Sequence, residues 1–214
     1  MDKGIINDVV EFVRDTFKAE YSGHDYFHTL RVYKMAERIA EQENADLMTV
    51  RLAALLHDVD DIKLSPGTYE NKDRAVGFLR GHGVSEEMIK NICNIIGEVS
   101  FRGTDSVTPS TIEGKCVQDA DRLDAMGAVG IARTFAYGGS HDRIIHDPEI
   151  KPTVNMDAEK YQGHISTSVN HFYEKLFLLG DMMNTDTAKK IAEQREDYMR
   201  NFISEFLDEW DGIR

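Results

Sequence analysis

Residues 52–61 read LAALLHDVDD, an apolar stretch that ends in adjacent His57 and Asp58. Two further acids, Asp60 and Asp61, follow directly. The apolar part predicts a helix that is buried on most sides. Acids are unfavourable at a helix C-terminus, because the helix dipole places partial negative charge there. A solvated helix end is one interpretation. The unfavourable placement favours the other, in which a bound cation compensates the acids.

The composition predicts one compact, all-α domain. The chain has 214 residues, of which 41% are hydrophobic and only four are proline. This length supplies one sizeable core, and few positions forbid helical dihedral angles. The formal net charge of -13 would repel a phosphate backbone. Binding of a nucleic acid polymer through a basic surface is therefore not expected.

The cysteine content and the length of the apolar segments indicate in which cellular compartment the protein is expected. Cys93 and Cys116 are too few for a disulfide framework in a chain of this size, which suggests a reducing compartment and buried, inert thiols. The first residues, MDKGIINDVVEFVRD, contain acids within the first apolar turns and no signal-peptide core. No apolar run approaches the roughly 20 residues that a membrane helix requires. We expect a soluble, cytoplasmic protein without a membrane partner.

Hydrophobic periodicity predicts a succession of helices and no strand of useful length. Residues 127–136 are small and apolar and should pack in the interior, whereas residues 137–162 show no periodicity and predict a long loop that could be functional. Ser85 is a candidate N-cap, and Pro109 a candidate first residue of a helix. The predicted helices cover 5–20, 27–42, 46–58, 69–80, 86–97, 109–125, 164–179 and 186–208.

Two other stretches hold residues that could bind metal. In GHDYFHTLRV, His24 and His28 are four apart and share a face if the helix has begun by residue 24. In CVQDADRLDAMGA, Asp119, Asp121 and Asp124 lie on or near an otherwise apolar helix, where a carboxylate is costly unless it is paired or bound to a cation. Each signal alone is weak, because a histidine on a helix face is more often a hydrogen-bonded core residue.

Taken in order, these motifs resemble the HD-domain metal-dependent phosphohydrolase superfamily. The stretches SGHDYFHTLRV, LAALLHDVDD, VQDADRLDAMGAVGIARTFAYGG and HFYEKL are similar to the small bacterial HD hydrolases of the YedJ/YpgQ type. The resemblance covers nearly the whole chain and implies the HD-domain fold. It also implies that His28, His57, Asp58 and Asp121 are the metal ligands.

This ligand set bears on the metal. Two imidazoles and two carboxylates suit a divalent transition metal; Mn²⁺ is favoured, with Fe²⁺, Co²⁺, Ni²⁺, Zn²⁺ or Mg²⁺ as alternatives. Four protein ligands in an octahedral site leave two positions for water and a phosphate oxygen. Relatives with two metals usually add histidines between the doublet and the last Asp. Because only His82 stands there, we expect one metal.

The resemblance also suggests which residues surround the reacting phosphate. Asp61 is the candidate general base, with Asp60 as the alternative and a solvated helix end as the structural interpretation of either. Lys63 and Arg122 could contact phosphate oxygens, or could form ordinary salt bridges. His24 could donate to the substrate phosphate, orient a metal ligand or act only in the structure.

HFYEKL places His171 and Lys175 four residues apart. The sequence gives this pair no chemistry, and we expect core packing with a polar partner.

The predicted function is metal-dependent hydrolysis of a small phosphorylated compound, with nucleotides as the favoured class. Two reactions stay open: release of a terminal phosphate, and cleavage of a nucleoside triphosphate to release pyrophosphate. The rival from another class is a non-catalytic helical module that binds metal and senses a nucleotide or binds a partner. A homodimer is compatible with either.

Overall fold

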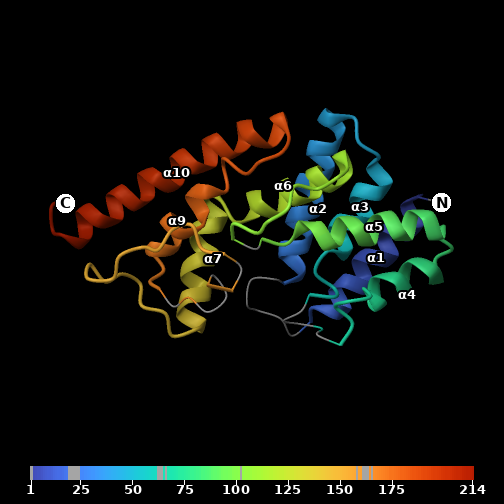
Figure 1. The fold of residues 1–214 in the computed structure, drawn as a ribbon, viewed down its shortest axis with the longest axis horizontal. Helices are drawn as coiled ribbons and strands as arrows, with labels where there is room; N and C mark the ends of the chain where they lie inside the picture. Colours follow the sequence, from blue (N-terminus) through green and yellow to red (C-terminus); the bar gives the residue numbers. More distant parts are fainter. Residues whose placement is uncertain are drawn as a thin grey trace. The chain divides into compact units, whose positions relative to one another are not determined.

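The structure, a computed structural model, is all-helical over the residues that it describes (Figure 1). These are residues 2–18, 25–61, 65, 67–101, 103–157, 159–160, 164 and 166–214. No strand occurs in that part of the chain, which confirms the predicted fold class. The elements in chain order are α1 (Asp2–Thr16), α2 (Tyr26–Glu43), α3 (Leu47–Leu56), α4 (Asp73–Gly81), α5 (Glu86–Val99), α6 (Ile112–Asp124), α7 (Gly127–Ser140), α9 (Asn170–Glu174), the 3-10 helix η1 (Leu176–Leu178) and α10 (Asp186–Trp210).

The chain groups into two compact units. The first comprises Met1–Ser100 and Val107–Asp121, and the second comprises Phe101–Ser106 and Arg122–Arg214. Helix α6 contributes its first ten residues to the first unit and its last three to the second. The sequence predicts that the whole chain forms a single domain. Whether the two units make up one domain stays a prediction.

Helix α3 is the centre of the first unit and packs against α1, α2 and α5. Its apolar residues from Leu52 to Leu56 are almost completely buried. Asp46 caps its N-terminus, since its carboxylate accepts a hydrogen bond from the backbone N–H of Thr49 at 2.8 Å. A helix buried on several sides and capped in this way is fixed in direction, so its C-terminal residues are held at a defined place.

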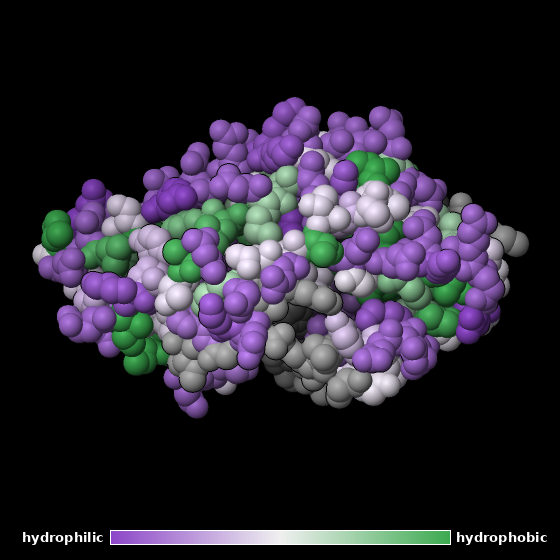
Figure 2. All heavy atoms as spheres, in the orientation of Figure 1, coloured by the Kyte–Doolittle hydropathy of each residue, from purple (hydrophilic) through white to green (hydrophobic). Residues whose placement is uncertain are grey.

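In the second unit, α10 packs against α7. Phe135 of α7 joins Phe172 of α9 and Phe202 and Phe206 of α10 in an aromatic cluster with ring centroids 6.0–6.1 Å from Phe135. In the face that Figure 2 shows, hydrophilic residues predominate along the upper edge of α10. The helix therefore has one apolar face against the core and one polar face.

Several predicted boundaries hold and others are wrong. Helix α5 begins after the N-cap Ser85, as expected, and α10 begins at the predicted residue 186. The helix predicted at 109–125 begins only at Ile112. The predicted loop from residue 137 is wrong over its first residues, because α7 continues through Ser140 despite two glycines. The helix predicted over 164–179 is replaced by the short α9 and η1.

Cys93 and Cys116 are both free thiols, and Cys116 is buried. Burial raises the pKa of Cys116 to about 12, with a further contribution from the carboxylate of Asp119. Burial also raises the pKa of Cys93. The predicted burial is confirmed for Cys116, whereas Cys93 is only partly buried. No helix in the described part of the chain combines the length and the apolar character needed to cross a membrane.

Candidate metal centre

Four side chains from three helices of the first unit converge on one point. His28 comes from the first turn of α2, His57 and Asp58 from the end of α3, and Asp121 from α6. Nε2 of His28 lies 3.4 Å from Oδ2 of Asp58 and 3.4 Å from Oδ1 of Asp121. Nε2 of His57 lies 3.2 Å from Oδ2 of Asp58 and 3.9 Å from Oδ1 of Asp121. Residues far apart in sequence thus present two imidazole nitrogens and two carboxylate oxygens to each other.

The start of α2 fixes His28. Asp25 is the N-cap, and its carboxylate accepts a hydrogen bond from the backbone N–H of His28 at 2.7 Å. The cap sets Tyr26 as the first residue of α2, so His28 lies in the first turn of the helix. Its side chain is 1% exposed. The GHDYFH motif therefore supplies both a ligand candidate and the residue that positions it.

The end of α3 fixes His57. Its Nδ1 lies 2.8 Å from the carbonyl oxygen of Ala54 and donates to it, so the proton is on Nδ1 and Nε2 keeps its lone pair. Nε2 is buried and has no hydrogen-bond partner among the described residues. Leaving such an atom without a partner in the interior is costly, and a metal ion bound there would remove the cost.

The charges of the cluster act on one another. Burial would raise the pKa of Asp121, but the hydrogen bond from His28 and the charges of the two imidazoles bring that pKa below its ordinary value. Burial would lower the pKa of His57, but Asp58 and Asp121 bring that pKa above its ordinary value. The site thus stabilises ionised carboxylates beside positive charge, which is the environment of a cation site.

The donor atoms fit one divalent ion. Two ligands about 2.1 Å from an ion and at right angles to each other are about 3.0 Å apart. The observed separations of 3.2–3.9 Å are slightly longer than this edge. One donor atom each from His28, His57 and Asp58 falls within a group no wider than 4.8 Å. That group holds three of the four residues, and Asp121 approaches it through the two imidazoles, at 3.4 and 3.9 Å.

Comparison with known proteins identifies the family. The family model described as HD domain matches residues 25–126, which include all four residues of the cluster. The protein YpgQ of Bacillus subtilis (strain 168) is 39% identical over 204 residues, which cover 94% of this chain and 92% of YpgQ. The chain belongs to the HD-domain superfamily, in its YpgQ-like group. The resemblance first seen in the motifs is thereby confirmed.

Solved structures support the same assignment for this HD-domain protein. An HD-superfamily hydrolase from Bacillus thuringiensis has a TM-score of 0.79 and 42% identity, with 99% of each chain covered. A protein from Lactobacillus plantarum has a TM-score of 0.87 and 36% identity, again with 99% of each chain covered. YpgQ in complex with ADP has a TM-score of 0.77 and 36% identity and covers 98% of this chain and 100% of its own. The chain therefore has the HD-superfamily hydrolase fold.

Asp60 and Asp61 have different surroundings in this HD-domain protein. Asp60 is 1% exposed, and its two carboxylate oxygens accept hydrogen bonds from the backbone N–H groups of Arg74 at 3.2 Å and Ala75 at 3.0 Å. These groups are in the first turn of α4, so Asp60 acts as a cap for that helix. Asp61 is only partly buried and stands three residues after Asp58, whose carbonyl accepts its backbone N–H at 3.1 Å. The carboxylate of Asp60 is thus held by the start of α4, and the role of Asp61 as a base stays a prediction.

The structure describes only some of the other residues that the sequence predicts around the substrate. Arg122 is buried and donates to the carbonyl of Met182, so its contacts are those of a structural residue, and its contact with substrate stays a prediction. Asp124 pairs with Arg133 at 2.6 Å. His24 and Lys63 lie outside the described residues, so their predicted contacts are not described either.

His82 does not join the HD-domain cluster. Its Nδ1 donates to the carbonyl of Phe78 at 2.8 Å, and its Nε2 lies 3.5 Å from Oδ2 of Asp8. Its ring also stacks on Phe78 at a centroid distance of 4.1 Å. The structure thus gives His82 partners of its own, and the expectation of a single metal stays a prediction.

Arg74 is a residue near the HD doublet that the motifs did not reveal. Its guanidinium donates to the carbonyl of Val59 at 3.3 Å, to Oγ of Ser65 at 3.1 Å and to Oγ1 of Thr16 at 2.9 Å. It therefore joins α1, the turn that follows His57 and the start of α4. No spacing rule signals such a contact, because its acceptors are 9 to 58 residues away in sequence.

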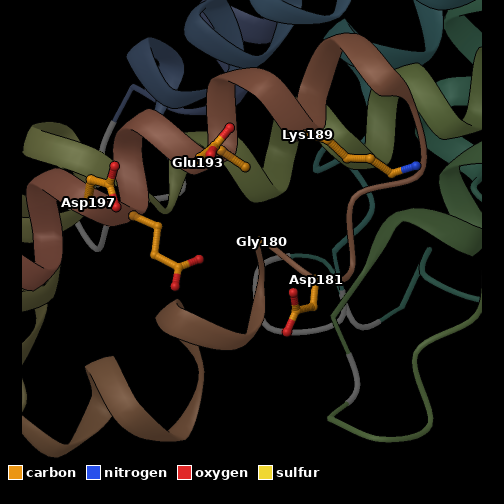
Figure 3. A pocket seen from close by; sticks show the side chains of 7 residues that line it. Gly180, Asp181, Lys189, Glu193 and Asp197 are labelled. Atoms are coloured by element: carbon orange, nitrogen blue, oxygen red, sulfur yellow. The ribbon is translucent and has the colours of Figure 1, made fainter.

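The second unit contains an acidic groove whose lining includes none of the four residues of the cluster. Its volume is about 410 Å³. Lys189, Glu193 and Asp197 extend from α10, and Asp181 lies on the segment before that helix (Figure 3). Lys189 pairs with Asp186 at 3.2 Å. With several acids and one paired lysine, the groove does not have the charge expected for binding a phosphate.

Proposed function

We propose that this HD-domain protein is a metal-dependent phosphohydrolase acting on small phosphorylated compounds, with nucleotides as the favoured class. One observation carries the proposal: Nε2 of each of two histidines lies 3.2–3.9 Å from carboxylate oxygens of the same two aspartates. Membership of the superfamily and the hydrolase fold support the general reaction. The relative YpgQ has been crystallised in complex with ADP, which supports nucleotides as the substrate class.

His28, His57, Asp58 and Asp121 are the proposed ligands of one divalent ion. The mixed nitrogen and oxygen set suits Mn²⁺ first, with the other transition metals and Mg²⁺ as alternatives. When bound, the ion lowers the pKa of water and polarises a phosphoryl oxygen. The hydrogen bond from Nδ1 of His57 to Ala54 keeps Nε2 available as a ligand.

The remaining residues of the site would move protons and bind the phosphate. Asp61 is the proposed base that takes the proton of the attacking water. Asp60 would hold the turn in place through its contacts with α4 rather than take the proton itself. Lys63 and His24 are the proposed contacts to phosphate oxygens, because a local cation is needed in a chain of net charge -13.

The test is a screen of nucleoside mono-, di- and triphosphates with Mn²⁺, Mg²⁺, Co²⁺ and Ni²⁺, comparing the wild type with Asp58→Ala. We expect turnover of at least one nucleotide by the wild type and loss of activity in the variant, because a ligand is removed while the fold is kept. Pyrophosphate measured before addition of pyrophosphatase separates the two reactions.

Two outcomes would count against the proposal. Equal turnover by the wild type and Asp58→Ala would exclude the cluster as the catalytic site. Binding of a nucleotide without turnover, with every metal, would favour the non-catalytic sensor instead.

A further inference from the structure

Arg74, the second residue of α4, contacts the turn that follows the His57-Asp58 doublet. Its side chain is partly buried. The guanidinium donates to three neutral oxygens, a backbone carbonyl and two hydroxyls, all in the first unit. Because a guanidinium is a planar fork of N–H donors, its hydrogen bonds are directional as well as strong. Arg74 is therefore suited to fixing the backbone that it contacts.

One nitrogen of Arg74 contacts both ends of the segment from Val59 to Ser65. Its Nη1 lies 3.3 Å from the carbonyl oxygen of Val59 and 3.1 Å from Oγ of Ser65. The backbone N–H of Ser65 donates to the carbonyl of Asp61 at 2.7 Å, and the backbone N–H of Asp61 donates to the carbonyl of Asp58 at 3.1 Å. A chain of hydrogen bonds thus leads from the guanidinium to the backbone of a proposed metal ligand.

The start of α4 holds the same turn through its backbone. The N–H groups of Arg74 and Ala75 donate to the two carboxylate oxygens of Asp60 at 3.2 and 3.0 Å. Val59 and Asp60, which follow the doublet, are 0% and 1% exposed. The side chain and the backbone of Arg74 therefore contact two consecutive buried residues. The direction in which the chain leaves Asp58 depends on these contacts.

The other nitrogen of the guanidinium anchors Arg74 to α1. Its Nη2 lies 2.9 Å from Oγ1 of Thr16, whose hydroxyl donates to the carbonyl of Phe12 at 2.9 Å. The guanidinium carbon also lies 5.9 Å from the centre of the Phe12 ring, within the range of a cation–π contact. Helix α1 packs against α3, the helix that ends at the doublet. The arginine is thus fixed on one side while it holds the turn on the other.

We propose that Arg74 is a positioning residue for the metal centre. It holds the turn so that the carboxylate of Asp58 reaches the ion and that of Asp61 reaches the attacking water. It touches neither the ion nor the substrate, and it acts through the carbonyl of Val59 and the hydroxyl of Ser65. The inference rests on the proposed function, because it concerns the same site.

The test measures the affinity of the full-length protein for Mn²⁺ by calorimetry, without substrate, in Arg74→Met and Arg74→Lys. A lysine keeps the charge but has one nitrogen in place of the fork, so it cannot make the contacts to the turn and to Thr16 together. Both variants should bind Mn²⁺ about tenfold more weakly, the lower end of the range for residues that hold metal ligands in place. Unchanged affinity in both would overturn the inference.

Arg51→Met is the matched control for lost stability. Arg51 of α3 is also partly buried, but its Nε donates to the carboxylate of Glu37 on α2 at 2.7 Å, away from the turn. The variant should unfold at a lower temperature, as Arg74→Met should, and should keep the wild-type affinity for Mn²⁺. Equal weakening of Mn²⁺ binding in Arg51→Met and Arg74→Met would assign the effect to general destabilisation and overturn the inference.

The visible absorption of the Co²⁺-loaded protein gives a second readout, because its bands depend on the coordination geometry of the ion. The bands should change in Arg74→Lys and stay the same in Arg51→Met. Failure of the proposed function would look different. If the wild type bound Mn²⁺ no better than Asp58→Ala, the cluster would be excluded as the metal centre, and the inference with it. Normal binding by the wild type, with an unchanged affinity and spectrum in Arg74→Lys, would overturn the inference alone.

Discussion

Ala54 shows how a residue without a polar side chain can set the chemistry of a site. Its carbonyl accepts the N–H of His57 at 2.8 Å and so selects the tautomer whose Nε2 faces Asp58 and Asp121. The ligand set itself could be predicted from His28, the His57-Asp58 doublet and Asp121. The acceptor could not, because every residue has a carbonyl and nothing in the sequence marks this one. The cap Asp25, by contrast, could be found from the sequence, because an aspartate at an N-cap accepts a hydrogen bond from the backbone N–H three residues later, here that of His28.

Substitutions of Asp60 and Asp61 are expected to have different effects, one on stability and the other on catalysis. Asp60→Ala should lower the free energy of unfolding by about 1–3 kcal/mol, because it leaves the N–H groups of Arg74 and Ala75 without their acceptor. Asp61→Asn should keep the stability and the bound metal but lower kcat by roughly a hundredfold or more, as expected for a general base. Urea denaturation and steady-state kinetics on both variants give the two readouts.

The reverse pattern would exchange the two roles. If Asp60→Ala kept its stability and lost its activity while Asp61→Asn turned over normally, Asp60 would be the base. Unchanged kcat in both variants would assign proton transfer to solvent.

At the scale of elements, strong periodicity and clear caps were predictable, and tertiary contacts were not. Helix α10 and the Ser85 cap of α5 follow from local sequence. The continuation of α7 through Gly138 does not, because glycine disfavours a helix unless close packing demands it. Here, Ser168 approaches Gly138 so closely that an added Cβ would lie 2.3 Å from its Oγ. A contact across 30 residues of sequence thus overrides the local signal.

This contact predicts opposite effects at adjacent glycines. Gly138→Ala should destabilise the protein by about 1 kcal/mol, because the added methyl displaces the Oγ of Ser168 from its present rotamer. Gly139→Ala is the control: no atom lies within 4 Å of its added Cβ, so it should be neutral or stabilise by up to about 1 kcal/mol. Thermal unfolding followed by circular dichroism compares them. Equal effects of the two substitutions would contradict the packing argument.

At the scale of the whole molecule, the proposed metal centre is confined to one of the two units. All four of its residues, from His28 to Asp121, belong to the first unit. The superfamily and the all-α class were predictable because the HD motifs are ordered and specific. The division into units was not, since no linker, repeat or change in composition marks residues 101–106 or the boundary after Asp121 within α6.

Metal binding should stabilise the folded protein, because its four ligands converge only when α2, α3 and α6 are assembled. At a free metal concentration 100 times Kd, the gain is about 2.7 kcal/mol. Adding a chelator should therefore lower the unfolding temperature of the wild type and have no effect on Asp58→Ala. An equal decrease in both proteins would mean that the stabilising metal binds elsewhere.

The most direct test of the account is the metal content of purified variants, measured by elemental analysis after equilibration with Mn²⁺. The wild type and the control His82→Ala should each hold about one equivalent, since His82 pairs with Asp8 outside the cluster. His28→Ala and Asp121→Asn should lose most of the bound metal. Full retention of metal in both ligand variants would contradict the proposed centre.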